Sequence, residues 1–315
     1  MKGVLPIFFI PVFLFLSFAV SGDIFGHEET ENGPADRFSP QEVMEAFAKA
    51  YPYRITRSGF YRGDWGVLID GTWYLYAGGR LLSEDVLFSP DYDKNRYARY
   101  PLYRYSSDLP PVRSFSGDEI RRIEAALDER EKNPPYRHPG IFNALWRIDS
   151  SKNAWNRMKT AFFLGKKILI HRDLLEDLAR VEEDILAAAA GSAEVRRYVD
   201  SIVSATGYNY RLIAGTRSLS FHSYGFAVDV IPASYGGKAV YWLWARGNGL
   251  PWYSLEYEKR YMPPPGVISI WEKHGFVWGG KWFHFDAMHF EYRPEILILN
   301  GIKPDAVDYI APWNQ

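Results

Sequence analysis

Two segments of the chain place imidazole and carboxylate side chains at spacings that suit a metal site. The first runs from Ser220 to Asp229 and includes His222, and the second, about sixty residues later, includes His289. Zinc in a hydrolytic site takes three protein ligands of these types and leaves a fourth position open. The bound ion lowers the pKa of a water from about 15.7 to about 7 and polarises a carbonyl. His222, Asp229 and His289 are therefore the candidate ligands of one catalytic zinc ion.

Such a site also needs a base that accepts the proton of the water. Asp286, three residues before His289, is the leading candidate. In a strand, positions 286 and 289 would face opposite sides, so the sequence predicts that Asp286 lies on a turn entering the strand. Glu291 is the reserve candidate. It is a same-face neighbour of His289 in a strand, which favours an orienting or structural role.

The composition limits the classes of protein that the chain can represent. Its 315 residues, 47% of them hydrophobic, suffice for one large domain or two modest ones. The 37 basic and 38 acidic side chains nearly balance, without the basic excess of a nucleic-acid binder. No cysteine is present, which excludes a disulfide framework and a lipid-modified cysteine. The sequence therefore predicts a globular protein that does not bind nucleic acid.

The first 21 residues have the pattern of an export signal. Lys2 precedes an apolar run from Val4 to Val20, and Ala19-Val20-Ser21 offers the small residues that a signal peptidase reads. Cleavage before Gly22 would place the protein in the periplasm or outside the cell, with no stable membrane span. An uncleaved N-terminal anchor is the alternative, because the apolar run is at the short limit for crossing a bilayer. Residues 22–40 are polar and are expected to form a flexible leader.

Residues 41–140 form an N-terminal region without a motif that reveals its role. Helical spacing predicts a helix over Gln41–Ala50, and a capping box predicts another over Ser116–Lys132. Asp70-Gly71, between two β-rich runs, predicts a hairpin. A wall-binding or substrate-shaping domain and a packing extension of the catalytic domain both remain open.

Residues 141–315 contain the candidate ligands and are expected to form the catalytic domain. Residues 141–167 show no clear period. Apolar spacing predicts helices over Arg172–Ala190 and Ala193–Ala205. A strand and turn are expected over Asn209–Thr216, and strands over Phe226–Ile231 and Met288–Tyr292.

Four blocks of this second part carry a family resemblance. They are Tyr208-Asn-Tyr-Arg211 through Gly215-Thr216, Ser220-x-His222-x-Tyr224-Gly225-x-Ala227-x-Asp229, Gly275-Phe276-x-Trp278-Gly-Gly280-x-Trp282, and Asp286-x-Met288-His289-Phe-Glu291. Together they resemble the VanY-type D-alanyl-D-alanine carboxypeptidase branch of the LAS zinc metallopeptidases, over about 170–298. The resemblance implies an α+β fold in which helices pack on a small antiparallel sheet that carries the zinc site. Residues 41–140 would then be an N-terminal α/β extension.

The resemblance also implies roles for individual residues. His222, Asp229 and His289 would be the ligands and Asp286 the base, although many relatives have glutamate at that position. Arg211 would neutralise an oxyanion or hold a substrate carboxylate. Ser220 would support its loop or contact the peptide. His284 could contact substrate, steady the oxyanion, or orient Asp286.

The function implied is hydrolysis of an amide bond in peptidoglycan stem peptides by a zinc-dependent D-alanyl-D-alanine carboxypeptidase. One alternative is an endopeptidase that cuts elsewhere in the stem or cross-link. Another is a non-catalytic, zinc-containing module that binds the cell wall or a partner, as the hedgehog members of the wider group do.

Overall fold

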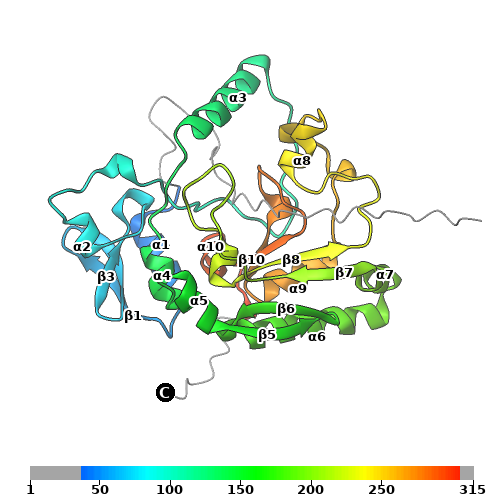
Figure 1. The fold of residues 1–315 in the computed structure, drawn as a ribbon, viewed down its shortest axis with the longest axis horizontal. Helices are drawn as coiled ribbons and strands as arrows, with labels where there is room; N and C mark the ends of the chain where they lie inside the picture. The colour runs from blue at the N-terminus through cyan, green and yellow to red at the C-terminus, as the bar shows by residue number, and fades with distance from the viewer. Residues whose placement is uncertain (1–36, 306–315) are drawn as a thin grey trace, which may run out of the picture.

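The computed structural model describes residues 37–305 of the chain (Figure 1). The expected export signal and the leader as far as residue 36 lie outside the described residues. Over 37–305, none of the helices has the length and apolarity needed to cross a membrane. The fold is mixed α+β with small antiparallel sheets and packed helices, which confirms the predicted fold class.

The N-terminal part consists of a helix packed on a four-stranded antiparallel sheet. The strands lie in the order β1-β2-β3-β4. The elements are α1 (Pro40–Ala50), β1 (Ile55–Tyr61), β2 (Asp64–Ile69), β3 (Thr72–Leu75), β4 (Leu82–Ser83) and α2 (Glu84–Leu87). The predicted first helix is confirmed, but it begins at Pro40, the last residue assigned to the leader. Ser39 caps it with a capping box, and proline is favoured at the first helical position.

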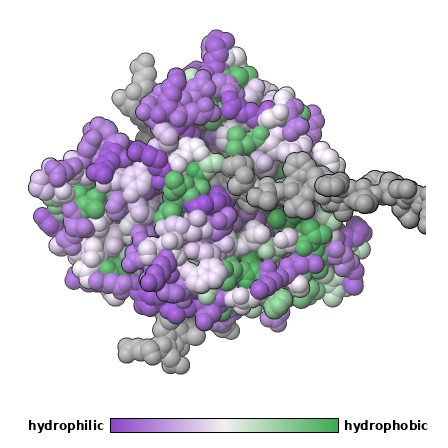
Figure 2. All heavy atoms as spheres, in the orientation of Figure 1, coloured by the Kyte–Doolittle hydropathy of each residue, from purple (hydrophilic) through white to green (hydrophobic). Residues whose placement is uncertain are grey.

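The predicted hairpin and the second capped helix are both present. Asp70 and Gly71 connect β2 to β3 with φ of 49° and 83°, the left-handed pair that a primed turn requires. Helix α3 (Gly117–Lys132) begins with a capping box between Ser116 and Glu119. Only Ile123 and Leu127 of α3 are buried, and the face of α3 that is visible in Figure 2 is mostly hydrophilic.

The region without a clear period, 141–167, is a succession of short elements. They are α4 (Gly140–Trp146), α5 (Ser151–Arg157), β5 (Met158–Phe163) and the first residues of β6 (Lys166–His171). Each element is too short to repeat a helical or strand pattern, which explains the weak signal. Strands β5 and β6 form a hairpin of their own.

A second four-stranded antiparallel sheet carries the candidate ligands. Its order is β7-β8-β10-β9, and helices α6, α7 and α9 lie beside it (Figure 1). The remaining helices and strands are α6 (Leu175–Gly191), α7 (Ala193–Ser201), β7 (Ile202–Thr206), β8 (Ala227–Pro232), α8 (Trp242–Gly247), α9 (Pro265–Lys273), β9 (Phe276–Trp278), β10 (His289–Tyr292) and α10 (Pro294–Leu299). Helix α6 and strands β8 and β10 confirm the predictions for those segments.

Two sequence predictions near this sheet are wrong. The helix expected over Ala193–Ala205 ends at Ser201, and residues 202–206 form β7. This segment is rich in β-branched side chains, and its backbone pairs with β8, so sheet pairing prevails over the helical pattern. Of the strand and turn expected over Asn209–Thr216, the turn is present at residues 214–215, but the strand is a loop with one isolated bridge, Leu212 to Leu219. Its backbone groups instead bond to the turn that carries His222.

The N-terminal region and the region that carries the ligands share one hydrophobic core. Helix α1 packs against α10, and Tyr51, at the end of α1, meets the rings of Trp146 and Tyr292 edge-on. The core cluster extends from Val43 to Tyr292. The division at residue 140 stays a prediction, but the packing across it is continuous.

Candidate metal centre

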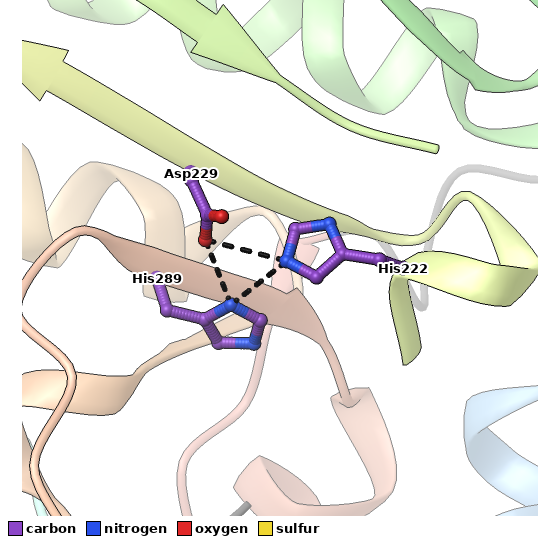
Figure 3. Close-up of side chains that lie close together, drawn as sticks. All are labelled: His222, Asp229 and His289. Atoms are coloured by element: carbon purple, nitrogen blue, oxygen red, sulfur yellow. Dashed lines mark hydrogen bonds and ion pairs between the residues drawn. The ribbon is translucent and has the colours of Figure 1, made fainter. Parts of the chain in front are cut away.

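The three candidate ligands converge from two strands and a short 3₁₀ helix. Asp229 on β8 and His289 on β10 are registered partners across the sheet. His222 lies in η4 (Phe221–Tyr224), which ends at Gly225. Figure 3 shows all three side chains pointing toward one another. One ligand atom from each lies within 4.8 Å of the others.

The spacing of the ligand atoms suits a tetrahedral ion. Asp229 Oδ1 lies 3.3 Å from His222 Nε2 and 3.0 Å from His289 Nδ1, and the two nitrogens are 3.2 Å apart. Zinc bonds of about 2.0–2.1 Å in tetrahedral geometry separate neighbouring ligands by roughly 3.3 Å. Among the described residues, the buried Oδ2 of Asp229 has no hydrogen-bond partner. The donor set and its geometry therefore fit one zinc ion.

Hydrogen bonds behind the two rings leave the correct nitrogens for an ion. The backbone oxygen of Gly207 lies 2.5 Å from His222 Nδ1, and a carbonyl can only accept, so Nδ1 carries a proton and Nε2 is the nitrogen that faces the other two ligands. Glu291 Oε2 lies 3.1 Å from His289 Nε2, which leaves Nδ1 for the ion. Such partners set the tautomer and orientation of ligand histidines.

Without an ion, the close contacts within the cluster shift the pKa values of Asp229 and His289. Burial alone would raise the pKa of the Asp229 carboxyl, but the charge of His222 and the hydrogen bonds from both histidines hold it well below its usual value. Burial opposes charge on His289, yet hydrogen bonds to Asp229 and Glu291 raise the pKa of His289 to about 10. Without an ion, His289 is therefore an imidazolium between two carboxylates.

Asp286 lies on a turn that enters β10, as the sequence predicted. The backbone N–H of His289 reaches the carbonyl of Asp286 at 3.4 Å, and Ala287 and Met288 form the turn between them. The side chain is buried, and Oδ2 has no partner among the described residues. Burial and the negative charge of Asp229 raise the pKa of Asp286 to about 7 in the metal-free protein, a value suited to a proton acceptor near neutral pH.

Arg211 brings a positive charge to the two carboxylates from the 207–220 loop. Burial lowers the pKa of Arg211, and the charges of Asp229 and Asp286 oppose that shift. Its Nη2 is buried and makes no hydrogen bond within the described residues. The Ser223 hydroxyl accepts from Arg211 N at 3.0 Å and donates to Arg211 O at 2.8 Å, which fixes the backbone of Arg211.

The other predicted site residues have different surroundings. Ser220 is buried and caps η4 by accepting from His222 N, so it supports the ligand turn. Glu291 contacts His289 Nε2, on the side of the ring away from the other two ligands, and also binds Arg293. His284 stacks on Trp252 and meets Trp242 edge-on. Its ring nitrogens have no partner among the described residues, so it makes no hydrogen bond to Asp286.

Two positions near the ligands require glycine, because a side chain would not fit there. Gly225 has φ of 71°, and an added Cβ would lie 2.5 Å from Met158 Sδ. An added Cβ at Gly280 would lie 2.1 Å from the Trp278 ring. That ring donates its N–H to Ala287 O at 3.0 Å. The glycines thus allow close packing beneath the turns that carry His222 and Asp286.

Sequence reasoning missed several contributors to the site. Gly207 acts through its backbone oxygen, which leaves no pattern of residue types. Ser223 could have been noticed, since it lies one residue after His222. Tyr235 comes from the segment between β8 and α9 and donates to Met288 Sδ at 2.8 Å. Burial raises its pKa, and the charges of Asp286 and Asp229 add to the shift, which places this phenol near the carboxylates.

A groove of about 800 Å³ lies elsewhere, between the N-terminal sheet and helices α4 and α5. Its walls include Tyr74, Asp85, Asn143, Arg147 and Arg157. None of the predicted site residues lines it. The metal cluster is instead buried, with each ligand at most 1% exposed. The chemistry is assigned to the cluster, because that is where the metal-ligating side chains meet.

The fold and the site together define an α+β protein with a buried His-Asp-His cluster that could hold one metal ion. Residues 214–292 match the model of a family described as D-alanyl-D-alanine carboxypeptidase, the M15 zinc peptidases. The matched segment contains all three candidate ligands and Asp286. Residues 43–102 match a family described as a domain of unknown function. No curated protein and no solved structure gives a significant match.

Proposed function

We propose that the chain is a zinc-dependent D-alanyl-D-alanine carboxypeptidase of the VanY-type branch that acts on peptidoglycan stem peptides. The observation that carries the proposal is the convergence of His222, Asp229 and His289, with ligand-atom separations of 3.0–3.3 Å. The cluster lies in the segment that matches the peptidase family. Asp286 and Arg211 complete the set of groups that amide hydrolysis requires.

The chain's own residues divide the chemistry between them. A zinc ion held by the three ligands would polarise the scissile carbonyl and acidify a water. Asp286 accepts a proton from the attacking water and returns it to the leaving amine. Arg211 faces the same carboxylates and offers a buried, unpartnered N–H to negative charge. Such a donor in a desolvated site stabilises an anion far more than it would in water.

Arg211 favours a carboxypeptidase over an endopeptidase. A carboxypeptidase must bind the terminal carboxylate of its substrate, and a guanidinium does so with charge-assisted hydrogen bonds. The free Nη2 of Arg211 is a donor of this kind beside the metal cluster. In an endopeptidase, the same position would face an uncharged backbone.

The proposed setting is the wall side of a membrane. The apolar run from Val4 to Val20 supports export, and it lies outside the described residues. Peptidoglycan peptides are found in that compartment, so substrate and location agree.

Digestion of purified muropeptides tests the proposal. The full chain is incubated with a pentapeptide stem, with and without a chelator, and the products are read by mass spectrometry. Loss of one D-alanine, abolished by chelator and restored by zinc, is the expected result. An internal cut would instead assign an endopeptidase, and unchanged stems with one zinc bound would indicate a binding module.

A further inference from the structure

A line of buried side chains joins the metal centre to the N-terminal region. It starts at the ligand His289 and passes through Glu291, Arg293 and Glu295 to Tyr51. His289 and Glu291 belong to β10, Glu295 belongs to α10, and Tyr51 caps the end of α1. The line therefore crosses from the ligand sheet into the part of the chain without an assigned role.

Every step of the line is a direct hydrogen bond. Glu291 Oε2 lies 3.1 Å from His289 Nε2, and Arg293 Nη1 donates to Glu291 Oε1 at 3.2 Å. Arg293 Nε donates to Glu295 Oε1. The Tyr51 hydroxyl donates to Glu295 Oε2 at 2.7 Å. The two carboxylates thus bind different nitrogens of one guanidinium, and each uses its other oxygen for the next member.

The line is isolated from solvent. Arg293 and Glu295 are 0% exposed, Glu291 is 1% exposed and Tyr51 is 7% exposed. Buried charges must be compensated by protein partners, because water is absent. Removing one member therefore changes the partners and position of the next. Burial and the charge of Glu295 raise the pKa of Tyr51, so its hydroxyl remains a donor.

The N-terminal region contacts this line at two points. Arg293 Nη2 donates to the backbone oxygen of Pro101 at 3.4 Å, and Tyr51 binds Glu295. Both Tyr51 and Pro101 lie within the residues 43–102 that match a domain of unknown function. The ring of Tyr51 is held by its contacts with Phe47, Trp146 and Tyr292, so its hydroxyl has a fixed position.

We propose that Tyr51 is a positioning residue for the metal centre, and that the N-terminal region completes the outer shell of the zinc site. The Tyr51 hydroxyl binds Glu295, and Arg293 binds the carboxylates of both Glu295 and Glu291. Glu291 in turn orients the ring of His289. The inference rests on the proposed metal centre, not on the bond that is cleaved. It gives the N-terminal region a role beyond packing.

Zinc affinity of the full-length protein tests this inference without any substrate. Tyr51→Phe removes only the hydroxyl and keeps the packed ring. Tyr100→Phe is the matched control: Tyr100 is also 7% exposed, and its hydroxyl donates at 2.7 Å to His138 O, outside the line. Removing a partner that orients a metal ligand weakens metal binding about 10- to 100-fold, which is expected for Glu291→Gln. Tyr51→Phe, three residues further along the line from Glu291, should weaken zinc binding by a smaller factor of about 3- to 10-fold, and Tyr100→Phe should not change it.

A double-mutant cycle separates positioning from general stability. Zinc dissociation constants are measured by competition with a chromogenic chelator, and metal-free Tm values are measured in parallel. If the line transmits the effect, Tyr51→Phe loses its effect on affinity in a Glu291→Gln background, because coupled residues are not additive. Equal zinc affinity of Tyr51→Phe and Tyr100→Phe, or full additivity in the cycle, would overturn the inference. Failure of the wild-type protein to bind zinc would instead reject the metal centre itself.

Discussion

The Nε2 atom of His222 and the Nδ1 atom of His289 lie 3.2 Å apart, so two histidines present different ring nitrogens to one point. The choice of nitrogen is set behind each ring, by the carbonyl of Gly207 and the carboxylate of Glu291. A ligand set is thus defined before an ion arrives, which reduces the reorganisation needed for binding.

Replacement of Asp286 by asparagine should separate catalysis from metal binding. The change keeps the size of the side chain but removes the proton acceptor, and the three ligands are untouched. Because general acid–base catalysis contributes about 10²- to 10⁴-fold, kcat should fall by that order while zinc content stays at one per chain. Zinc is measured by elemental analysis and turnover by D-alanine release. Full activity of the variant would transfer the role of base to another group.

His222→Ala, unlike Asp286→Asn, should abolish zinc binding itself. It removes one of three ligands and also leaves the carbonyl of Gly207 without its donor. His138→Ala is a suitable control, since His138 lies outside the cluster and its Nδ1 accepts from Gly140 N. Zinc titration should show one tight site in the control and none in His222→Ala. Retention of tight zinc by His222→Ala would disprove its assignment as a ligand.

Zinc binding should release a proton and strengthen with rising pH. Hydrogen bonds to Asp229 and Glu291 raise the pKa of His289 to about 10, so the metal-free ring is protonated at pH 7. The ion needs the Nδ1 lone pair and must displace that proton. Between about pH 7 and 9 the apparent affinity should rise roughly tenfold per pH unit. Calorimetry in buffers of different ionisation enthalpy should give close to one proton per zinc, and a value of zero would contradict the charge state inferred for His289.

The sequence predicted the cluster well because its parts are encoded locally. His222 and Asp229 are seven residues apart around Gly225, and Asp286 is tied to His289 by one turn. Long-range partners left no such signal. Tyr51 and Glu295 meet across 244 positions, and the role of Gly207 depends on a backbone oxygen that any residue could supply.

The errors in secondary structure have a related cause. Apolar spacing extends the predicted helix to Ala205. Backbone hydrogen bonds to β8 make residues 202–206 a strand instead. The loop from Asn209 to Thr216 satisfies its backbone with η4 and Ser223, partners that come later in the chain. Tertiary pairing of this kind is not visible in a local window.

Gly225→Ala should destabilise the protein because this residue has a left-handed backbone and no space for a side chain. Its φ is 71°, and the new Cβ would lie 2.5 Å from Met158 Sδ and 2.7 Å from His171 N. The backbone alone costs about 1–2 kcal/mol, and the overlap adds to it. Gly247→Ala, in α8 with nothing within 4 Å of its Cβ, should be neutral or stabilising by about 0.5–1 kcal/mol. Thermal unfolding of both variants checks the contrast, and equal Tm values would reject the packing argument.

Arg211→Met should abolish the preference for substrates that end in a free carboxylate. The buried Nη2 of Arg211 has no partner among the described residues, and a hydrogen bond to a charged group contributes about 1.5–3 kcal/mol. Loss of that bond corresponds to roughly 10- to 150-fold in kcat/KM for the acid. The kcat/KM for a matched peptide with a C-terminal amide should change little. The ratio of kcat/KM for the acid to kcat/KM for the amide should therefore fall toward one. If Arg211 instead stabilises the oxyanion, both peptides lose kcat equally and the ratio is unchanged, which would remove the argument for a carboxypeptidase.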